Sequence, residues 1–590
     1  MKKIKTYIKK FKEAAPLILG IIYRNDKKAM FLGIFSNLLQ SAFLIFQIIV
    51  KTEFFIRLQD YKGGGTWHLI LFFALYGIII LIFHVLNGLA NFFMNLVFNR
   101  FNTYMKNEIG VKASKLEPIY FEIPENLNNL NRAKTGVSDL LWFVFSPIVS
   151  ACIYIPYMIF TSVYFFGKDA SFALVIPVVF IPALVSNLLR AKYKFKLAEE
   201  EASATRAKDE YKSYIVEKSA KEMRSGGYFN YLNKKYLDNW NKAKKLRHKT
   251  NLQIMAIDIL LSMLSMAGYG ILLYAIITKS MNTVVEVAVI ASVLTTLSEV
   301  TGLIREFIQN MIEPMADSAG NMSFAIDFFN EKEREEKAKV DHIDSVKISD
   351  LSFKYPSADN YSVKGVNLEL KRDKLVAIVG ENGSGKSTLL KLVLGLFEPT
   401  SGDIKYFRND KEEKNIDILD RSSALFQDYN KYKLTLRENI EISDLYNIED
   451  NKWKDALAHA DIELNSNLFP NGGETIMSRD FDGVDLSGGQ WQRLALARGI
   501  YRDRDLLVLD EPTAAIDPLE ETALYNKISD IMKGKLGLLI THRIGSARLA
   551  DEILVMDKGE IIERGTHDEL MTARGMYWEM VGAQAVWYER

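Results

Sequence analysis

Residues 380–387 read GENGSGKS, and this stretch decides the fold of the second half of the chain. A short apolar run at 375–379 precedes it and predicts a buried strand of a parallel sheet, while a helix is predicted over 388–396. A glycine-rich turn between a strand and a helix lets backbone N–H groups wrap around phosphates, and the helix start adds a favourable dipole. We therefore expect a phosphate-binding loop here.

Two side chains of this loop have a defined chemistry in such a site. The Lys386 ammonium reaches the β- and γ-phosphates of ATP, and the Ser387 hydroxyl binds Mg²⁺. The other predicted ATP contacts come from the loop and the helix start, namely Gly380, Asn382, Gly383, Ser384, Gly385 and Thr388. The expected cofactors are ATP and Mg²⁺.

An acidic pair follows a second apolar strand, which is predicted over 506–509. The strand ends in Asp510 and Glu511. A carboxylate in this position holds Mg²⁺ directly or through water, so Asp510 is an expected metal ligand. Glu511 is expected to polarise a water for attack on the γ-phosphate, as a general base. Beside the phosphate loop, this pair predicts an ATP hydrolase.

The first 310 residues differ in kind, because long apolar runs crowd them. A membrane span needs about 20 apolar residues. Six runs qualify; the first four have no Asp, Glu, Lys or Arg, the fifth carries only Asp258, and the sixth carries four such residues. They lie at 29–50, 67–98, 140–167, 171–189, 252–278 and 282–311. We expect six transmembrane helices.

The charges of the loops predict the orientation, since cytoplasmic loops are rich in Lys and Arg. Residues 1–28 hold nine Lys and Arg, and residues 191–250 hold 16 against 8 Asp and Glu. We therefore expect a multi-pass protein of the plasma membrane with its cytoplasmic side formed by both termini, the long loops 99–139 and 191–250 and the ATPase domain. Frequent use of Lys and Asn is typical of an AT-rich bacterial genome. Turns at 117–126 and 224–229 combine chain breakers with aromatic residues. They are either docking points for a partner domain or plain surface turns.

Polar residues inside the predicted spans are costly in lipid and usually face protein or water. Two interpretations stay open for them, a wet substrate cavity and hydrogen bonding between helices. The candidates are Gln40, Gln47, His84, Asn87, Asn91, Asn95, Asp258, Glu286 and Glu299.

Composition excludes several classes of protein. The net charge of +1 argues against a nucleic-acid binder, and the single cysteine, Cys152, allows no intrachain disulfide or thiolate metal cluster. The N-terminus lacks the pattern of a secretory signal.

A dense charge run within 326–339 is typical of a solvated linker. The predicted domains are a basic amphipathic segment over 1–28, a membrane domain over 29–329, a linker over 330–345 and a nucleotide-binding domain over 346–590.

Residues 486–490 read LSGGQ and are followed by WQR. This stretch resembles the signature sequence of ABC proteins. The resemblance extends over the whole chain, because the layout is similar to that of half-transporters in the ABC exporter family. It implies an α-helical membrane domain of six transmembrane helices with long cytoplasmic extensions. An α/β P-loop ATPase domain with a helical subdomain that carries the signature is implied to follow.

The resemblance also assigns roles to single residues. Tyr355 lies 25 positions before Gly380, where the family stacks an aromatic ring on adenine. Gln427 is similar to the glutamine that touches Mg²⁺ and senses the membrane domain. His542 is similar to the switch histidine on the γ-phosphate. Both residues join Glu511 in the expected catalytic set.

The signature implies a dimer, because in this family it contacts the ATP held by another copy. The contacts in trans are expected from Ser487, Gly488, Gly489, Gln490 and Asp517. The loop 514–517 matches the family at its Asp, while its start departs slightly from the usual small residues. One chain then holds half of each ATP site, so the expected partner is a second copy or a related half-transporter.

The cargo is predicted less directly. Residues 482–493 and 120–133 resemble exporters of lanthipeptides and other ribosomal peptides, although these are scaffold features. We expect ATP-driven export of a peptide or peptide-derived product by alternating access. A lipid or multidrug exporter of amphipathic substrates stays open, as does a membrane ATPase with a regulatory role. An importer is disfavoured, because importers usually keep their spans and ATPase on separate chains.

Overall fold

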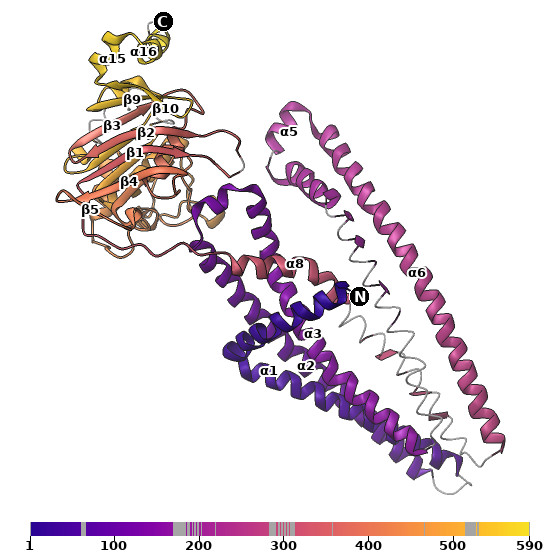
Figure 1. Ribbon diagram of the computed structural model, residues 1–590. Helices are drawn as coiled ribbons and strands as arrows, with labels where there is room; N and C mark the ends of the chain where they lie inside the picture. Colours follow the sequence, from indigo (N-terminus) through magenta and orange to yellow (C-terminus); the bar gives the residue numbers. More distant parts are fainter. Residues whose placement is uncertain are drawn as a thin grey trace. The chain divides into compact units, whose positions relative to one another are not determined.

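The computed structural model describes residues 2–60, 66–168, 203–218, 220–282, 313–356, 358–464, 467–513 and 530–588, with single positions within 185–201 and 291–306 and at 527 (Figure 1). It divides into two units. The first holds Met1–Lys115 and Glu125–Lys332, and the second holds Leu116–Pro124 and Glu333–Arg590. The short segment Leu116–Pro124 thus leaves the first unit and belongs to the second.

The first unit consists of helices, several of them far longer than a soluble domain needs. They are α1 (Lys2–Gln59), α2 (Trp67–Ser114), α3 (Pro124–Lys168), the π-helical turn η3 (Tyr214–Lys218), α5 (Ala220–Gly226), α6 (Phe229–Asn282) and α8 (Glu313–Asn330). Four candidate membrane spans lie in the described residues, at Ile18–Gln59, Trp67–Ser114, Pro124–Gly167 and Phe229–Gly268. The other two expected spans, 171–189 and 282–311, fall largely outside the described residues.

Helix α1 bends at Asp26, where the backbone leaves the helical region (φ −155°, ψ 61°). The Asp26 carboxylate accepts a hydrogen bond from the Ala29 N–H at 3.2 Å, which caps the second part of the helix. The same carboxylate pairs with Arg100 of α2. The bend therefore separates the basic N-terminal segment from the first apolar span.

The second unit is built around two sheets. An antiparallel sheet has the order β2-β1-β4-β5, and a six-stranded sheet has the order β10-β9-β3-β8-β7-β6. The strands are β1 (Ser345–Phe353), β2 (Val363–Lys371), β3 (Lys374–Val379), β4 (Ser401–Arg408), β5 (Lys411–Glu413), β6 (Ser422–Leu425), β7 (Leu506–Asp510), β8 (Leu536–Ile540), β9 (Glu552–Asp557) and β10 (Glu560–Gly565). Strands β3, β8 and β7 lie next to one another in the six-stranded sheet and are largely buried, and the apolar runs at 375–379 and 506–509 predicted two of them, β3 and β7.

Helices surround these sheets. They are α9 (Lys386–Val393), α10 (Leu436–Glu441), α11 (Lys452–His459), α12 (Gly488–Arg502), α14 (Ile544–Ala547), α15 (His567–Ala573) and α16 (Met576–Tyr588). Helix α9 begins two residues earlier than predicted and ends three residues earlier. Gly395 adopts a left-handed conformation (φ 63°), which stops the helix. One face of α9, with Leu389 and Leu392, is fully buried in the core between the sheets.

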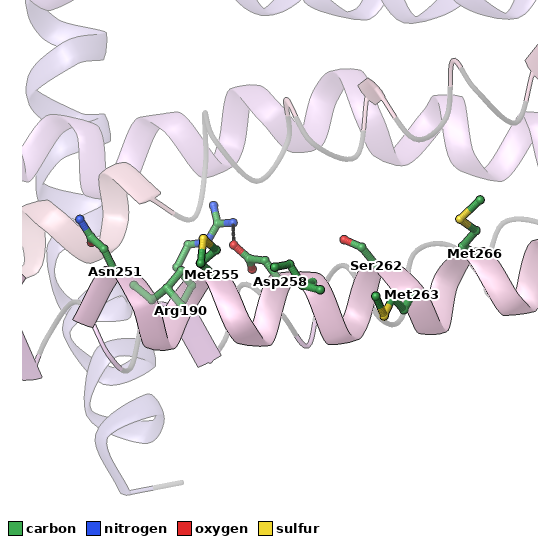
Figure 2. A pocket seen from close by; sticks show the side chains of 9 residues that line it. Arg190, Asn251, Met255, Asp258, Ser262, Met263 and Met266 are labelled. Atoms are coloured by element: carbon green, nitrogen blue, oxygen red, sulfur yellow. Dashed lines mark hydrogen bonds and ion pairs between the residues drawn. The ribbon is translucent and has the colours of Figure 1, made fainter. Parts of the chain in front are cut away.

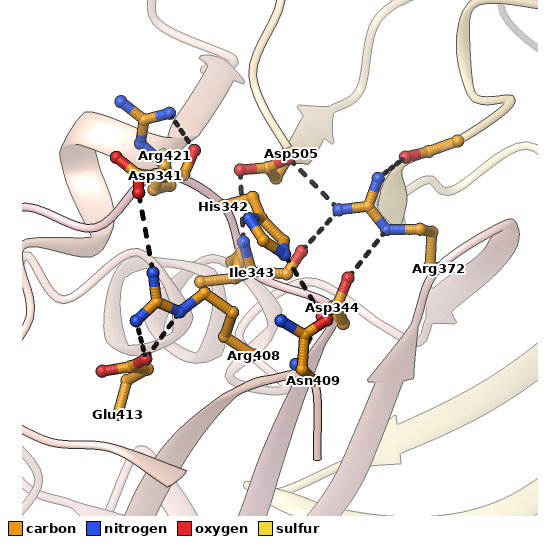
Figure 3. Close-up of polar contacts among 11 residues, drawn as sticks. Asp341, His342, Ile343, Asp344, Arg372, Arg408, Asn409, Glu413, Arg421 and Asp505 are labelled. Atoms are coloured by element: carbon orange, nitrogen blue, oxygen red, sulfur yellow. Dashed lines mark hydrogen bonds and ion pairs between the residues drawn. The ribbon is translucent and has the colours of Figure 1, made fainter. Parts of the chain in front are cut away.

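The charged segment before β1 is held more firmly than a solvated linker. Ala338 exchanges backbone hydrogen bonds of 2.8 Å with Asn415 and Asp417. Further along, the Arg372 guanidinium donates to the Ile343 carbonyl at 2.9 Å (Figure 3). It also pairs with Asp344 at 3.2 Å and with Asp505 at 3.3 Å. This polar cluster ties the residues entering β1 to strands β2 and β7.

The turn expected at 117–126 forms the short 3₁₀ helix η1 (Pro118–Glu122). Ile119 packs against the apolar core of the second unit. The Glu122 carboxylate pairs with the Lys391 ammonium of α9 at 2.6 Å. Of the two interpretations, docking is confirmed for this turn. At the second turn, Tyr228 and Phe229 are exposed.

Candidate nucleotide-hydrolysis site

Four parallel strands of the six-stranded sheet end at one edge and carry most of the predicted site residues there. Strand β8 lies between β3 and β7, and β6 pairs with β7 on the other side. The phosphate loop follows β3, His542 follows β8, Asp510 and Glu511 close β7, and Gln427 follows β6. Because parallel strands finish at the same edge, residues far apart in sequence meet there.

The phosphate loop needs glycine at its two ends. Gly380 (φ 153°) and Gly385 (φ 103°) have positive φ angles. A Cβ atom at Gly380 would lie 2.1 Å from the Met556 carbonyl oxygen, and one at Gly385 would lie 2.2 Å from that of Ser362. Larger residues would therefore force the loop open. The tight turn directs the unsatisfied N–H groups of the α9 start toward a phosphate.

Lys386 lies inside the loop with its side chain buried. Its ammonium donates hydrogen bonds to the carbonyl oxygens of Gly380 at 2.9 Å and Glu381 at 2.8 Å, and it lies 3.4 Å from the Ser384 hydroxyl. Burial lowers the pKa of Lys386, while the nearby carboxylates of Glu511 and Asp510 act against that shift. Phosphate oxygens are stronger acceptors than carbonyls for such a cation. The loop therefore presents a desolvated positive charge that suits a polyphosphate.

Asp510 is the buried acid of the site, with only 5% of its surface exposed. Burial, and then the adjacent Glu511, raise its pKa to about 6, whereas a hydrogen bond with Ser387 opposes the rise. A carboxylate with a raised pKa gains from a nearby cation. Mg²⁺ prefers carboxylate and hydroxyl oxygens combined with substrate phosphates, so Asp510 and Ser387 fit this ion together.

Glu511 sits between two of the predicted residues. One carboxylate oxygen accepts a hydrogen bond from the Gln427 amide at 2.9 Å, and the other lies 2.9 Å from His542 Nε2. The Glu511 backbone is left-handed (φ 49°), which is uncommon for a residue other than glycine. Its N–H donates to Ile540 O at 2.9 Å, and its carbonyl accepts from the Gln492 side chain at 2.8 Å. The carboxylate is thus aimed by backbone and side-chain contacts at once.

The surroundings of His542 favour its neutral form. Burial lowers its pKa first, and the Lys386 charge lowers it further, while Glu511 acts in the opposite direction. A neutral imidazole donates its Nε2–H to the Glu511 carboxylate without forming a full ion pair.

Two residues of this site escaped the sequence analysis. Gln584 of α16 donates to the His542 carbonyl and accepts from the Ile544 N–H at 3.0 Å. Gln492 of α12 holds the Glu511 carbonyl. Gln492 is the middle residue of the WQR stretch after the signature, and Gln584 lies in no motif. The sequence did not indicate the role of either residue, because their contacts depend on the tertiary fold.

The signature forms the exposed start of α12. Ser487 is the N-cap, and a capping box joins it to Gln490, with distances of 2.9 and 3.3 Å. Tyr429 donates to the Gly488 carbonyl at 3.0 Å, and Gly489 lies in the first turn. The capping box therefore fixes the backbone conformation at the start of α12.

The remaining predicted residues fall into three groups. The Tyr355 ring packs on Phe353 and Phe397, and its hydroxyl lies 3.3 Å from that of Thr388. Asn382 and Gly383 lie on the exposed turn of the phosphate loop. Asp517 and the rest of the 514–517 loop lie outside the described residues.

The polar residues of the predicted spans occupy different environments in the structure. Asp258 faces Arg190 at 2.5 Å beside a methionine-lined cavity (Figure 2). Glu299 pairs with Lys51 at 2.8 Å. Gln47 is buried, and Glu286 lies outside the described residues. The other five candidates line a single cavity; they are Gln40, His84, Asn87, Asn91 and Asn95.

Fold and site together define a P-loop ATPase joined to a membrane domain. Residues 363–514 match the family model described as ABC transporter. The subtilin transport ATP-binding protein of Bacillus subtilis is 31% identical over 485 residues, which cover 80% of this chain and 78% of that protein. The nisin transport ATP-binding protein of Lactococcus lactis subsp. lactis is 26% identical, covering 96% and 95%.

Two further comparisons complete this result. The ATP-dependent lipid A-core flippase of Vibrio vulnificus is 37% identical over 40% of each chain. The solved structure of a bacterial Atm1-family ABC exporter with ATP bound superposes with a TM-score of 0.77, at 17% identity, over 95% of this chain and 98% of that one. The chain belongs to the ABC transporter family, with an exporter fold and an ATP-hydrolysing domain. It is an ATP-driven exporter.

Proposed function

We propose that this exporter moves a peptide or peptide-derived product out of the cell across the plasma membrane, working as a dimer with ATP and Mg²⁺. The extent of the similarity carries the proposal. The subtilin and nisin transport proteins match over 80% and 96% of the chain, so the match includes membrane helices. The lipid A-core flippase matches over only 40%. Cargo meets the membrane helices, so similarity there bears on cargo more than similarity between ATPase domains does.

The chemistry proposed for the ATPase domain follows from the contacts of Glu511. Gln427 and His542 fix its two carboxylate oxygens, and the carboxylate orients the attacking water and takes its proton. Lys386 and the phosphate-loop backbone hold the β- and γ-phosphates. Mg²⁺, held by Ser387 and Asp510 with Gln427 nearby, would neutralise charge on the phosphates.

A second chain completes each site in this proposal. The exposed start of α12, with Ser487 and Gly489, would contact the γ-phosphate of an ATP held by the partner chain, and Asp517 would join it. Bound ATP then favours the closed pair of ATPase domains, and hydrolysis lets them part. The turn η1 transmits the movement, a role supported by Ile119 in the core and the pair between Glu122 and Lys391. Basic loops support a cytoplasmic location of both termini.

Transport into inside-out vesicles tests the proposal. Vesicles containing the protein are given ATP and Mg²⁺ with a fluorescent pool of linear peptides, a fluorescent phospholipid or a cationic dye. We expect accumulation of peptides, and none with Glu511→Gln. Movement of the lipid or the dye alone would show that the cargo is a lipid or an amphipathic cation and not a peptide. ATP hydrolysis without accumulation of any of the three would favour a regulatory ATPase.

A further inference from the structure

One cavity of the helical unit gathers polar side chains that sequence alone left scattered. It has a volume of about 560 Å³ and lies among residues of α1, α2 and α3. Gln40 comes from α1, and His84, Asn87, Asn91 and Asn95 come from α2. These side chains interrupt spans that are otherwise strongly apolar, so the cost of placing them at membrane depth needs a compensating contact.

Three of these residues form a ladder of amides. Asn87, Asn91 and Asn95 are four residues apart, which puts them on one face of α2 at steps of about 6 Å. The Asn91 amide donates to the Asn87 side-chain oxygen at 3.3 Å. Each amide offers two donors and an acceptor with two lone pairs, so the one side-chain bond of the ladder within the part of the chain that the structure describes uses only a small share of its hydrogen-bonding capacity.

Gln40 supplies a second observation that points to a ligand. Its side chain is only 4% exposed, and among the described residues its Oε1 atom finds no hydrogen-bond partner. A buried carbonyl oxygen without a donor has lost its hydrogen bonds to water and gained none in return, which is unfavourable. Because Gln40 lines the cavity, a donor on a bound molecule would remove this cost.

The rest of the lining restricts the chemistry of the ligand. Glu306 is the only Asp, Glu, Lys or Arg among the described residues that line the cavity. Trp142 and Phe98 add apolar surface, with ring centroids 5.5 Å apart. The cavity thus suits a ligand that is rich in amides, partly apolar and cationic or neutral.

We propose that this cavity binds an extended peptide segment, whose backbone amides pair with the asparagine ladder and with Gln40 while Glu306 faces a basic side chain. Every second residue of an extended chain presents its backbone on the same side, at intervals of about 6.6–6.8 Å. The helical step of about 6 Å differs from this by less than about 1 Å per rung, which side-chain rotation absorbs. The assignment of the peptide as exported cargo rests on the proposed function, whereas the binding itself does not.

Direct binding without nucleotide tests this inference. The full-length protein in lipid nanodiscs is titrated into a short fluorescein-labelled peptide of alternating lysine and alanine, and anisotropy is recorded. Two further probes have the same length: one is N-methylated at alternate backbone amides, and the other has glutamate in place of lysine. The variants are Asn91→Ala with Asn95→Ala, and Gln40→Leu. Asn107→Ala is the matched control, an exposed asparagine further along α2 and outside the cavity.

We expect the unmodified probe to bind native protein and the control equally. Its Kd should rise roughly tenfold in the double variant, because about two hydrogen bonds are lost. The N-methylated probe should bind about tenfold more weakly, with a Kd that the double variant hardly changes. Asn91→Gln with Asn95→Gln should restore part of the affinity, and the acidic probe should bind worst.

Three results would overturn the inference. The first is equal binding of the methylated and unmethylated probes to native protein, or no binding of either. The second is an unchanged Kd in the double variant. The third is loss of the dimer in that variant with peptide affinity intact, which would assign the ladder to contact between two chains. Peptide binding in nanodiscs without peptide transport in the vesicle assay would contradict the proposed function. It would not contradict the proposed binding site.

Discussion

The contact between the C-terminal helix α16 and the loop that carries His542 leads to a quantitative prediction. Gln584 holds the backbone on both sides of Arg543, because it donates to the His542 carbonyl and accepts from the Ile544 N–H at 3.0 Å. His542 in turn lies 2.9 Å from Glu511. Gln584→Leu keeps the volume of the side chain and removes both hydrogen bonds. The change therefore loosens the loop that carries His542 and leaves the contacts of the phosphate loop in place.

The magnitude follows from the two lost hydrogen bonds. Each contributes about 0.5–1.5 kcal/mol, so the catalytic conformation of the loop loses roughly 1–3 kcal/mol. If the transition state needs that conformation, kcat falls by about 5-fold to 150-fold. The KM for ATP should change little, because Lys386 and the loop glycines keep their contacts.

Steady-state ATPase activity in nanodiscs, with the melting temperature, provides the assay. Glu579→Gln is the matched control, since Glu579 is exposed on the same helix. A loss of kcat in Gln584→Leu at constant KM supports a positioning role for Gln584. An unchanged kcat would refute the reasoning, and so would an equal loss in the control. A rise in KM that matches the fall in kcat would indicate general damage instead.

Three other changes have distinct outcomes. Glu511→Gln should bind ATP with near-native affinity yet lower the hydrolysis rate by at least about 100-fold, since a general base contributes about 10²–10⁴-fold; near-native turnover would contradict the role of Glu511. Asp344→Asn should lower the melting temperature at pH 7, and the difference from the native protein should shrink as the pH falls below about 4. The hydrogen bond from the Asn409 N–H holds the pKa of Asp344 below its usual value, so this stability is present above about pH 4 and is lost as the pH falls through the folded pKa. Equal melting temperatures at pH 7 would count against this. Lys391→Glu should weaken cargo stimulation of ATPase activity by no more than about 5-fold, because an exposed pair contributes less than about 1 kcal/mol, and adding Glu122→Lys should restore it. No rescue in the double variant would argue against coupling through this pair.

Much of the ATP site was readable from the sequence because its motifs are local. The phosphate loop needs its glycines, lysine and serine within eight consecutive positions, and the acidic pair follows a strand recognisable by its apolar letters. The four described membrane-length helices were readable for a similar reason, since an apolar run of about 20 residues with at most one charged residue has one favourable environment. The predicted end of the helix after the loop was wrong, because the left-handed Gly395 stops it earlier.

The sequence by itself determined the class of the protein, the chemistry of its phosphate loop and the presence of a membrane half. Only the tertiary structure decided which residues meet. Gln427 and Glu511 are 84 positions apart, and Gln584 is 42 positions beyond His542, yet sheet order and the docked C-terminal helix bring each pair into hydrogen-bond distance. The same holds for Gln40 and the asparagine ladder, which lie on different helices. Local motifs arise from the steric and hydrogen-bonding demands of a few adjacent residues, whereas contacts over long separations depend on how whole strands and helices pack.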